Sequence, residues 1–298
     1  MERSVFHRLQ PVGSLIPQGM KIFALLAFSA TAFAGKPIVI TEPEPRGYFQ
    51  IDGAYGAEAD YAGGSSSVWS GRAQLGFIRP LTGIGLLANR DGQWQLRLGL
   101  DHERFEFSGL ALPSRLQRVS AVVALEYRIG RQVGILLEAK PGVHFENNVR
   151  SNAWNCPVLF GIGIPVTERF AVALAGRYDA FAENQFIGGP GFVWKISDKL
   201  TLNAVPPEPR LRWDASENLS LWLGGEVAGG AFRTESNALV DYSDYRASIG
   251  ATLRQGAWLM EAGAGVSFER EWAFHRIGTT VSTDEPAPFF KLAVRTEW

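Results

Sequence analysis

The sequence is poor in the residues that build disulfides and metal clusters. Its 298 residues include one cysteine, Cys156, and four histidines. A single cysteine excludes an internal disulfide and any cluster held by several cysteines. The formal net charge of −1 leaves no basic excess, which argues against nucleic acid as a partner. We therefore expect no cofactor and no nucleic-acid function.

The chain also lacks long helical periodicity and any apolar run long enough to cross a bilayer as a helix. What it has instead is glycine (33 residues) and aromatic side chains (12%, with nine tryptophans). Glycine, aromatic residues and strand formers in this abundance are typical of a sheet that closes on itself. The composition therefore favours an all-β protein.

The N-terminal region carries the pattern of a secretory signal. Met20 and Lys21 precede a short apolar run at 22–33, which ends in Ala32-Phe33-Ala34. A positive start, a short apolar core and small residues at the end predict a signal peptide at residues 1–34, cleaved after Ala34. Residues before Met20 have no pattern, so Met20 is an alternative start of the protein. The signal predicts export from the cytoplasm.

Two segments follow the signal. Residues 35–46 are rich in proline and glutamate and are expected to form a periplasmic tail. Residues 47–298 alternate between apolar and polar positions over segments of roughly 11–14 residues, longer than an ordinary strand and long enough to cross a membrane at a tilt. In one such segment Ile135, Leu137, Ala139, Val143 and Phe145 oppose Glu138, Lys140, His144 and Glu146. Residues 47–298 therefore predict an outer-membrane β-barrel.

The alternation predicts a closed antiparallel transmembrane β-barrel of 14 strands. Short polar turns alternate with longer segments such as 59–66 and 273–285, as they do at the two ends of a membrane barrel. The uncertain part is residues 200–213, where prolines separate two short strands. If this hairpin does not belong to the wall, the barrel has 12 strands.

The C-terminal segment predicts both the location and the closure of the barrel. Phe290, Leu292, Val294 and Trp298 lie on one face of an amphipathic strand that ends in an aromatic residue. Such a strand resembles the assembly signal of bacterial outer-membrane β-barrels. We therefore expect the barrel assembly machinery and outer-membrane lipids as partners, in a bacterium with two membranes. The last strand should pair with the first, which begins near Gly47.

A more specific resemblance lies in residues 189–255. This region contains the sequence from Gly189 to Trp194, then Val205 to Trp213, then Leu223 to Glu226, and finally Asp244-Tyr245-Arg246. The order of these pieces resembles a family of uncharacterised bacterial outer-membrane β-barrel proteins, classed only as a domain of unknown function. The resemblance covers about residues 47–298. It implies a fold and a location, and it carries no catalytic residue to this chain.

The candidate functional residues are charged side chains on the face opposite the apolar one. One interpretation is a hydrated pore that passes small polar solutes of unknown identity. The alternative is a lumen plugged by salt bridges, in a structural or interaction barrel. The candidates for lining the lumen are Arg72, Arg97, Glu126, Arg128, Glu138, Lys140, Arg177, Glu226, Arg246, Arg254, Glu261 and Arg295.

Catalysis has little support in the sequence. Barrel enzymes that modify lipids use serine and histidine near the membrane surface. The exported part of this chain has only His102, His144 and His275, and no arrangement of serine, histidine and acid is evident. We therefore expect no enzyme, no catalytic residue and no metal site, and we keep a lipid-modifying enzyme as the least favoured hypothesis.

Overall fold

A computed structural model describes residues 47–81, 92–109, 112–129, 133–275 and 278–298. Within these residues every regular element is a β-strand, and no helix is long and apolar enough to span a bilayer. The predicted signal peptide and periplasmic tail lie outside the described residues. The strands are β1 Gly47–Tyr61, β2 Gly64–Leu81, β3 Gly92–Phe107, β4 Arg115–Ile129, β5 Val133–Ala139, β6 Gly142–Glu146, β7 Trp154–Asn155, β8 Val158–Pro165, β9 Phe170–Tyr178, β10 Phe186–Lys195, β11 Leu200–Asn203, β12 Arg210–Asp214, β13 Leu219–Arg233, β14 Leu239–Gln255, β15 Trp258–Phe274, β16 Thr279–Ser282 and β17 Ala287–Glu297.

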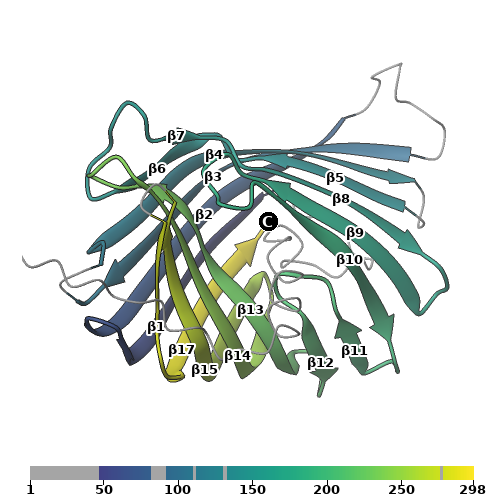
Figure 1. Cartoon of the computed structure of the whole chain (residues 1–298). Coiled ribbons are helices and arrows are strands. Elements are labelled where there is room, and N and C mark those ends of the chain that lie inside the picture. Colours follow the sequence, from purple (N-terminus) through teal and green to yellow (C-terminus); the bar gives the residue numbers. More distant parts are fainter. Residues whose placement is uncertain (1–46, 82–91, 110–111, 130–132, 276–277) are drawn as a thin grey trace, which may run out of the picture.

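The 17 strands form one sheet that closes on itself as an antiparallel barrel of 14 wall strands. Three wall strands are interrupted, and each interruption contains a proline: Pro141 between β5 and β6, Pro157 between β7 and β8, and Pro286 between β16 and β17. Proline cannot donate to the ladder, so each strand is broken where its proline lies. The prediction of 14 strands is confirmed. The short strands β11 and β12 belong to the wall, which excludes the alternative of 12 (Figure 1).

The barrel is closed by the first and last strands. β1 pairs with β17 from Tyr48 opposite Glu297 to Gly56 opposite Phe289. At the end of this seam Gly47 and Trp298 exchange two backbone hydrogen bonds, of 3.0 and 3.1 Å. A Cβ atom at Gly47 would lie 2.7 Å from the Trp298 indole ring, so a larger residue there would displace this ring. The other edge of β17 pairs with Trp258–Ser267 of β15, as the alternation predicts.

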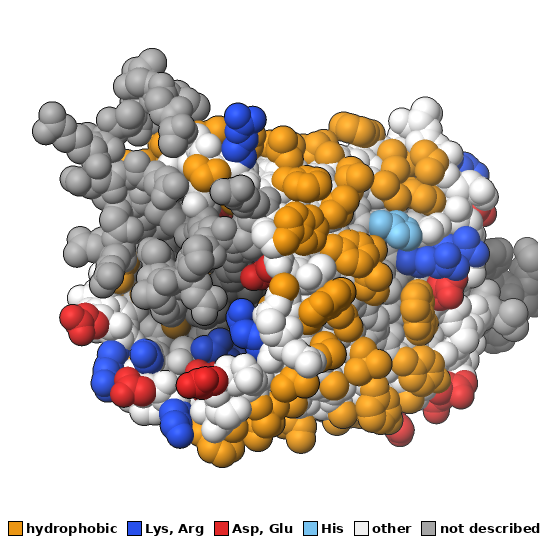
Figure 2. Space-filling view, turned by 180° about the vertical axis from the view of Figure 1, so that it is seen from behind, with side chains coloured by type: hydrophobic (Ala, Val, Ile, Leu, Met, Phe, Trp, Pro, Cys, Tyr) orange, Lys and Arg blue, Asp and Glu red, His pale blue; other side chains and the backbone are white. Residues whose placement is uncertain are grey.

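The exterior of the barrel is apolar between its two ends. Leu98, Leu137, Leu174 and Ile249 point outward with 47 to 64% of their surface exposed. Figure 2 shows a broad field of hydrophobic side chains on one face of this exterior, with most charged side chains at its edges. An exposed apolar surface this large is unfavourable in water and favourable in a bilayer. The outward face therefore contacts lipid.

One end of the barrel folds inward, which the alternation does not predict. β6 lies beside β13, with Phe145 paired to Arg233 in parallel. At this end nine strands complete the circle, namely β1–β4, β6 and β13–β16, and the strands between β6 and β13 are left outside it. The expected outward position of Phe145 is wrong for this reason: only 7% of its surface is exposed. The short turns lie at the opposite end, so the inward-folded end is the extracellular one.

We expect deletion of Trp298 to lower assembly of the barrel. The deletion removes two seam hydrogen bonds and the ring contact with Phe77, whose centroid lies 6.3 Å from that of Trp298. The measurement is the amount of heat-modifiable protein in outer-membrane fractions. Wild-type assembly without Trp298 would show that the aromatic end is incidental.

Candidate functional site: the charged lumen

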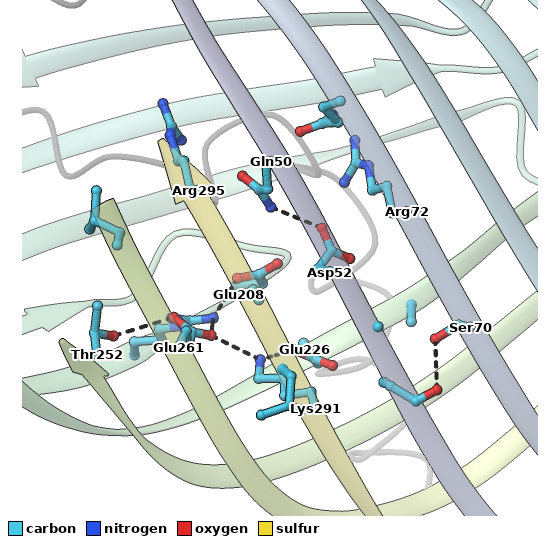
Figure 3. A pocket seen from close by; sticks show the side chains of 18 of the residues that line it. Gln50, Asp52, Ser70, Arg72, Glu208, Glu226, Thr252, Glu261, Lys291 and Arg295 are labelled. Carbon is cyan, nitrogen blue, oxygen red and sulfur yellow. Dashed lines mark hydrogen bonds and ion pairs between the residues drawn. The ribbon is translucent and has the colours of Figure 1, made fainter. Parts of the chain in front are cut away.

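The barrel encloses a cavity of about 460 Å³. It begins at the periplasmic end, beside Asn218, Arg254 and Leu259, and extends as far as Phe105. The wall strands position its lining because every second residue of a strand points inward. Figure 3 shows such side chains on β1 and β2 and on the nearby strands β17, β15 and β14. The cavity is therefore polar, surrounded by a wall whose outer surface is apolar.

The first group of charges comes from β2, β3 and β5. Asp101 accepts two hydrogen bonds from Arg72, at 2.9 and 2.8 Å, and lies 3.3 Å from the Lys140 ammonium. Glu138 lies 3.3 Å from Lys140 and 2.6 Å from Arg97. Both carboxylates are almost fully buried. Each therefore has two cationic partners, which offsets the cost of removing it from water.

The second group lies across the lumen, on β12 to β17. Glu261 is 2.8 Å from Arg210 and 3.6 Å from the Lys291 ammonium. Glu226 pairs with the same Lys291 and lies 3.1 Å from Arg246. The two groups together make the lining close to neutral, since ten lining side chains are Arg or Lys, seven are Asp or Glu, and further buried acids lie behind them. A lumen of this kind favours small polar solutes with weak selectivity for charge.

Buried charges also hold the wall together towards the extracellular end. Asp244 is fully buried and accepts hydrogen bonds from Arg246 at 2.8 Å and from the Ser267 hydroxyl at 2.5 Å. Arg270 is also fully buried, with its Nε atom 3.8 Å from Asp244. Arg270 donates to the carbonyl oxygens of Ala57 and Ser66, at 2.8 and 3.0 Å. These carbonyls flank a β-bulge in the pairing of β1 with β2, so Arg270 replaces ladder bonds that the bulge removes.

Above this network the lumen is filled by aromatic side chains, which we call the aromatic seal. Phe105, Phe107, Tyr242 and Trp272 contact one another with ring centroids 4.8 to 5.4 Å apart, mostly edge to face. They come from β3 on one side and from β14 and β15 on the other, and all four are less than 8% exposed. Further apolar side chains complete the seal: Tyr61, Val68, Leu112, Leu116, Phe232 and Val240. Close packing of this kind excludes water from the extracellular end.

The loop after β9 closes the space outside the aromatic seal. Its Asp179 accepts hydrogen bonds from the Asn155 amide at 2.8 Å and from the Phe181 backbone at 3.0 Å. Burial raises the pKa of Asp179, but the Arg177 guanidinium and these hydrogen bonds outweigh burial and hold that pKa below its ordinary value. Phe181 packs against Ala231 of β13. The loop is thereby fixed to the inward-folded end.

The histidines do not assemble a catalytic site among the described residues. His144 is 1% exposed, and its Nδ1 atom lies 3.1 Å from the carbonyl oxygen of Ala231 on β13. This contact gives His144 a structural role at the junction of β6 and β13. His102 faces outward on β3, and no group of three possible metal ligands occurs in the described part of the chain.

The structure places most of the candidate lumen residues in one cavity. Glu126 lies 3.7 Å from Arg97 on the inward face. Arg177 lies apart from the cavity, beside Asp179, and the side chain of Arg128 is outside the described residues. The candidates that line the cavity are Arg72, Arg97, Glu138, Lys140, Glu226, Arg246, Arg254, Glu261 and Arg295.

Several functional residues were missing from the sequence-based set. Asp52, Glu208 and Arg210 line the cavity, and the aromatic seal closes it. A signal for the seal was present, because Phe105, Tyr242 and Trp272 occupy the inward positions of their strands. A run of aromatic residues on the face that is otherwise charged indicates that the lumen becomes apolar at that height.

A closed antiparallel barrel with an apolar exterior and a charged interior defines the class of this protein: it is a membrane-spanning β-barrel. No protein-family model and no curated protein matches the chain.

Solved structures with a similar course of the chain include an outer membrane channel, a porin and an autotransporter domain. An outer membrane channel from Pseudomonas putida F1 has 12% sequence identity and a TM-score of 0.47, over 87% of this chain and 97% of that chain. A mutant of the Rh. blastica porin has 9% identity and a TM-score of 0.36, over 85% and 98%. The translocator domain of the autotransporter NalP from Neisseria meningitidis has 10% identity and a TM-score of 0.34, over 94% and 95%.

We expect Asp244→Ala to destabilise the barrel by about 3–5 kcal/mol, because it leaves the buried guanidinium of Arg246 without its nearest carboxylate. The measurement is urea-induced unfolding in detergent or lipid. The control is Asp198→Ala, which removes an exposed ion pair with Arg169 and should cost only about 0–1 kcal/mol. Equal losses in the two variants would contradict the role given to Asp244.

Proposed function

We propose that this protein is a passive outer-membrane channel of narrow bore for small polar solutes. The single observation that carries the proposal is the charged cavity, which reaches the periplasmic end of the barrel and is surrounded by a wall with an apolar exterior. Paired charges of both signs keep such a lumen hydrated without a strong preference for anions or cations. The aromatic seal restricts passage at the extracellular end.

The proposal includes the route by which the protein reaches the membrane. A signal peptide cleaved after Ala34 would export the chain, and the terminal strand ending in Trp298 would present it to the barrel assembly machinery. The pieces between Gly189 and Arg246 support membership in a family of uncharacterised outer-membrane barrels. N-terminal sequencing of membrane-extracted protein, which should begin at or near Gly35, tests the export step.

A second candidate function is a structural or interaction barrel with a plugged lumen. The observation that favours it is the aromatic seal, whose side chains come from both sides of the lumen and are at most 8% exposed. A barrel sealed at one end would present only its outer surface and its extracellular segments to partners. A lipid-modifying activity has no comparable support, since His144 contacts a backbone carbonyl.

Conductance separates the two candidates. In planar bilayers the wild-type protein should give small, discrete conductance steps with weak ion selectivity. The triple variant Phe105→Ala/Tyr242→Ala/Trp272→Ala should give steps several-fold larger, because it empties the aromatic seal and leaves every charged lining residue in place. The control is Phe268→Ala, which removes the same kind of ring from the outward face.

Two results would count against the channel. No conductance from the wild type or from the triple variant would favour the plugged barrel. Large wild-type conductance that the triple variant does not change would show that the aromatic seal does not restrict the pore. Circular dichroism and heat-modifiability establish that each variant is folded.

A further inference from the structure

The strands of the barrel wall are short on one side, between β10 and β13, and we call this region the low part of the wall. β11 and β12, which connect these two strands, have only four and five residues. β11 pairs with β10 only at Val193–Lys195, and β12 pairs with β13 only at Ser220–Gly224. One further hydrogen bond follows on each side: Ala204 donates to Phe192 at 2.8 Å, and Gly225 donates to Pro209 at 2.9 Å. Beyond these bonds the wall between β10 and β13 ends.

The remaining edges of β10 and β13 have no ladder partner among the described residues until β13 reaches β6. Alternate residues of an antiparallel strand direct their backbone groups to opposite neighbours. The Phe192 carbonyl oxygen points towards the segment that connects β11 to β12. The backbone carbonyl groups of Pro190, Gly188 and Phe186 therefore point to the same side of β10. On β13 the backbone groups of Val227 and Gly229 point to the same side as those of Gly225, towards β10. Ala231, the next in this series, already has the His144 ring at its carbonyl oxygen.

These free edges lie within the apolar belt. Phe186 is paired with Tyr178 at the extracellular side of the belt, and Trp194 with Phe170 at the periplasmic side. Phe186, Tyr178 and Trp194 are all exposed aromatic residues, which concentrate at the two membrane interfaces. Gly188 and Pro190 therefore lie between the interfaces. Proline has no N–H group, so the edge of β10 has one fewer unpaired hydrogen-bond donor at Pro190.

A free strand edge is not tolerated in the hydrocarbon of a bilayer unless it lines a water-filled space. The charged cavity supplies that space, because Val227, Ala228 and Gly229 belong to its lining. The same segment of β13 thus borders the lumen on one side and the low part of the wall on the other. The aromatic seal blocks the route straight through the extracellular end. The low part of the wall is the remaining route from the cavity towards the outer leaflet.

We propose that the space between β10 and β13 is a lateral opening through which a small amphipathic solute exchanges between the lumen and the outer leaflet. This assignment rests on the proposed channel function and specifies its solute. The rim offers apolar side chains, Phe186, Pro190 and Val227, and bare backbone at Gly188 and Gly229. An apolar body fits this rim, while a polar or charged head finds partners among the paired charges of the lumen.

The test is the accessibility of a nitroxide spin label to oxygen, which concentrates in hydrocarbon, and to a water-soluble nickel complex. The background is Cys156→Ser, which removes the only native thiol. A label at Val227→Cys in liposomes should collide with both reagents. Two matched controls define the extremes: Leu98→Cys on the apolar exterior should meet oxygen alone, and Ala54→Cys in the cavity lining should meet the nickel complex alone.

The expected result is a nickel accessibility at Val227→Cys several-fold above that at Leu98→Cys, together with an oxygen accessibility several-fold above that at Ala54→Cys. Nickel access alone would show that protein covers the rim on the lipid side, and oxygen access alone would show that the rim does not reach the lumen. Either result overturns the proposal. Pro190→Cys on the opposite rim serves as the second position if Val227→Cys does not fold. Collision rates do not depend on conductance, so this test can fail while the channel function stands.

Sodium octanoate tests the solute class. If an amphipathic molecule occupies the opening, octanoate should lower the nickel accessibility at Val227→Cys in a saturable manner, and glucose at the same concentration should not. At Leu98→Cys neither compound should change it. No effect of octanoate, or an equal effect of glucose, would overturn the assignment of an amphipathic solute.

Discussion

The requirement that every backbone N–H and C=O group find a partner inside a bilayer governs this structure. No water is present in the hydrocarbon to satisfy these groups, so the sheet must close. Closure here depends on the seam between β1 and β17 and on the two hydrogen bonds between Gly47 and Trp298. The sheet can lose its continuity only where another group replaces the missing ladder or where the free edge lines a water-filled space. His144 at Ala231 and Arg270 at Ala57 are two such replacements.

Inside the closed wall, the chemistry changes with height. The periplasmic part contains carboxylates that are each held by two cations, such as Asp101 and Glu138, around a cavity. The extracellular part contains the aromatic seal, which needs no ion pairs because its side chains are apolar. Asp244 and Arg246 lie between the two parts, with Arg246 reaching down to Glu226 and Asp244 hydrogen-bonded to Tyr242 above. The inward fold of β6 and β13 makes this division, because it brings opposite walls close enough for the rings to meet.

Much of the wall could be predicted from the sequence because a strand alternates with a period of two. The outward position of Leu98, the number of wall strands and the pairing of the last strand with the first all follow from this alternation. The ends of the strands were harder to predict. Residues 59–66, expected to form a loop, are strand except for a turn at Ala62–Gly63, because the wall continues beyond the apolar belt.

The contacts across the lumen could not be predicted, since alternation indicates which face a side chain takes and not what it meets there. Phe145 has the spacing of a lipid-facing residue, yet β13 covers it. Arg246 was expected to line the lumen, but its buried pairing with Asp244, two residues away on the same strand, could not be foreseen. The proline-rich segment between β11 and β12 raised the question of strand number. This segment also leaves free edges on β10 and β13. These edges follow from the short pairings of β11 with β10 and of β12 with β13, which only the structure reveals.

The extracellular end closes between β6 and β13, which leaves β10 and β13 apart. A disulfide between Phe145→Cys and Arg233→Cys, in the Cys156→Ser background, measures this closure directly, because the two positions are paired. The positive control is the pair Phe49→Cys and Thr296→Cys on the seam of the barrel. Oxidation of outer membranes should link both pairs. A link at the seam with none between positions 145 and 233 would contradict the inward fold, and the division of the lumen would fail with it.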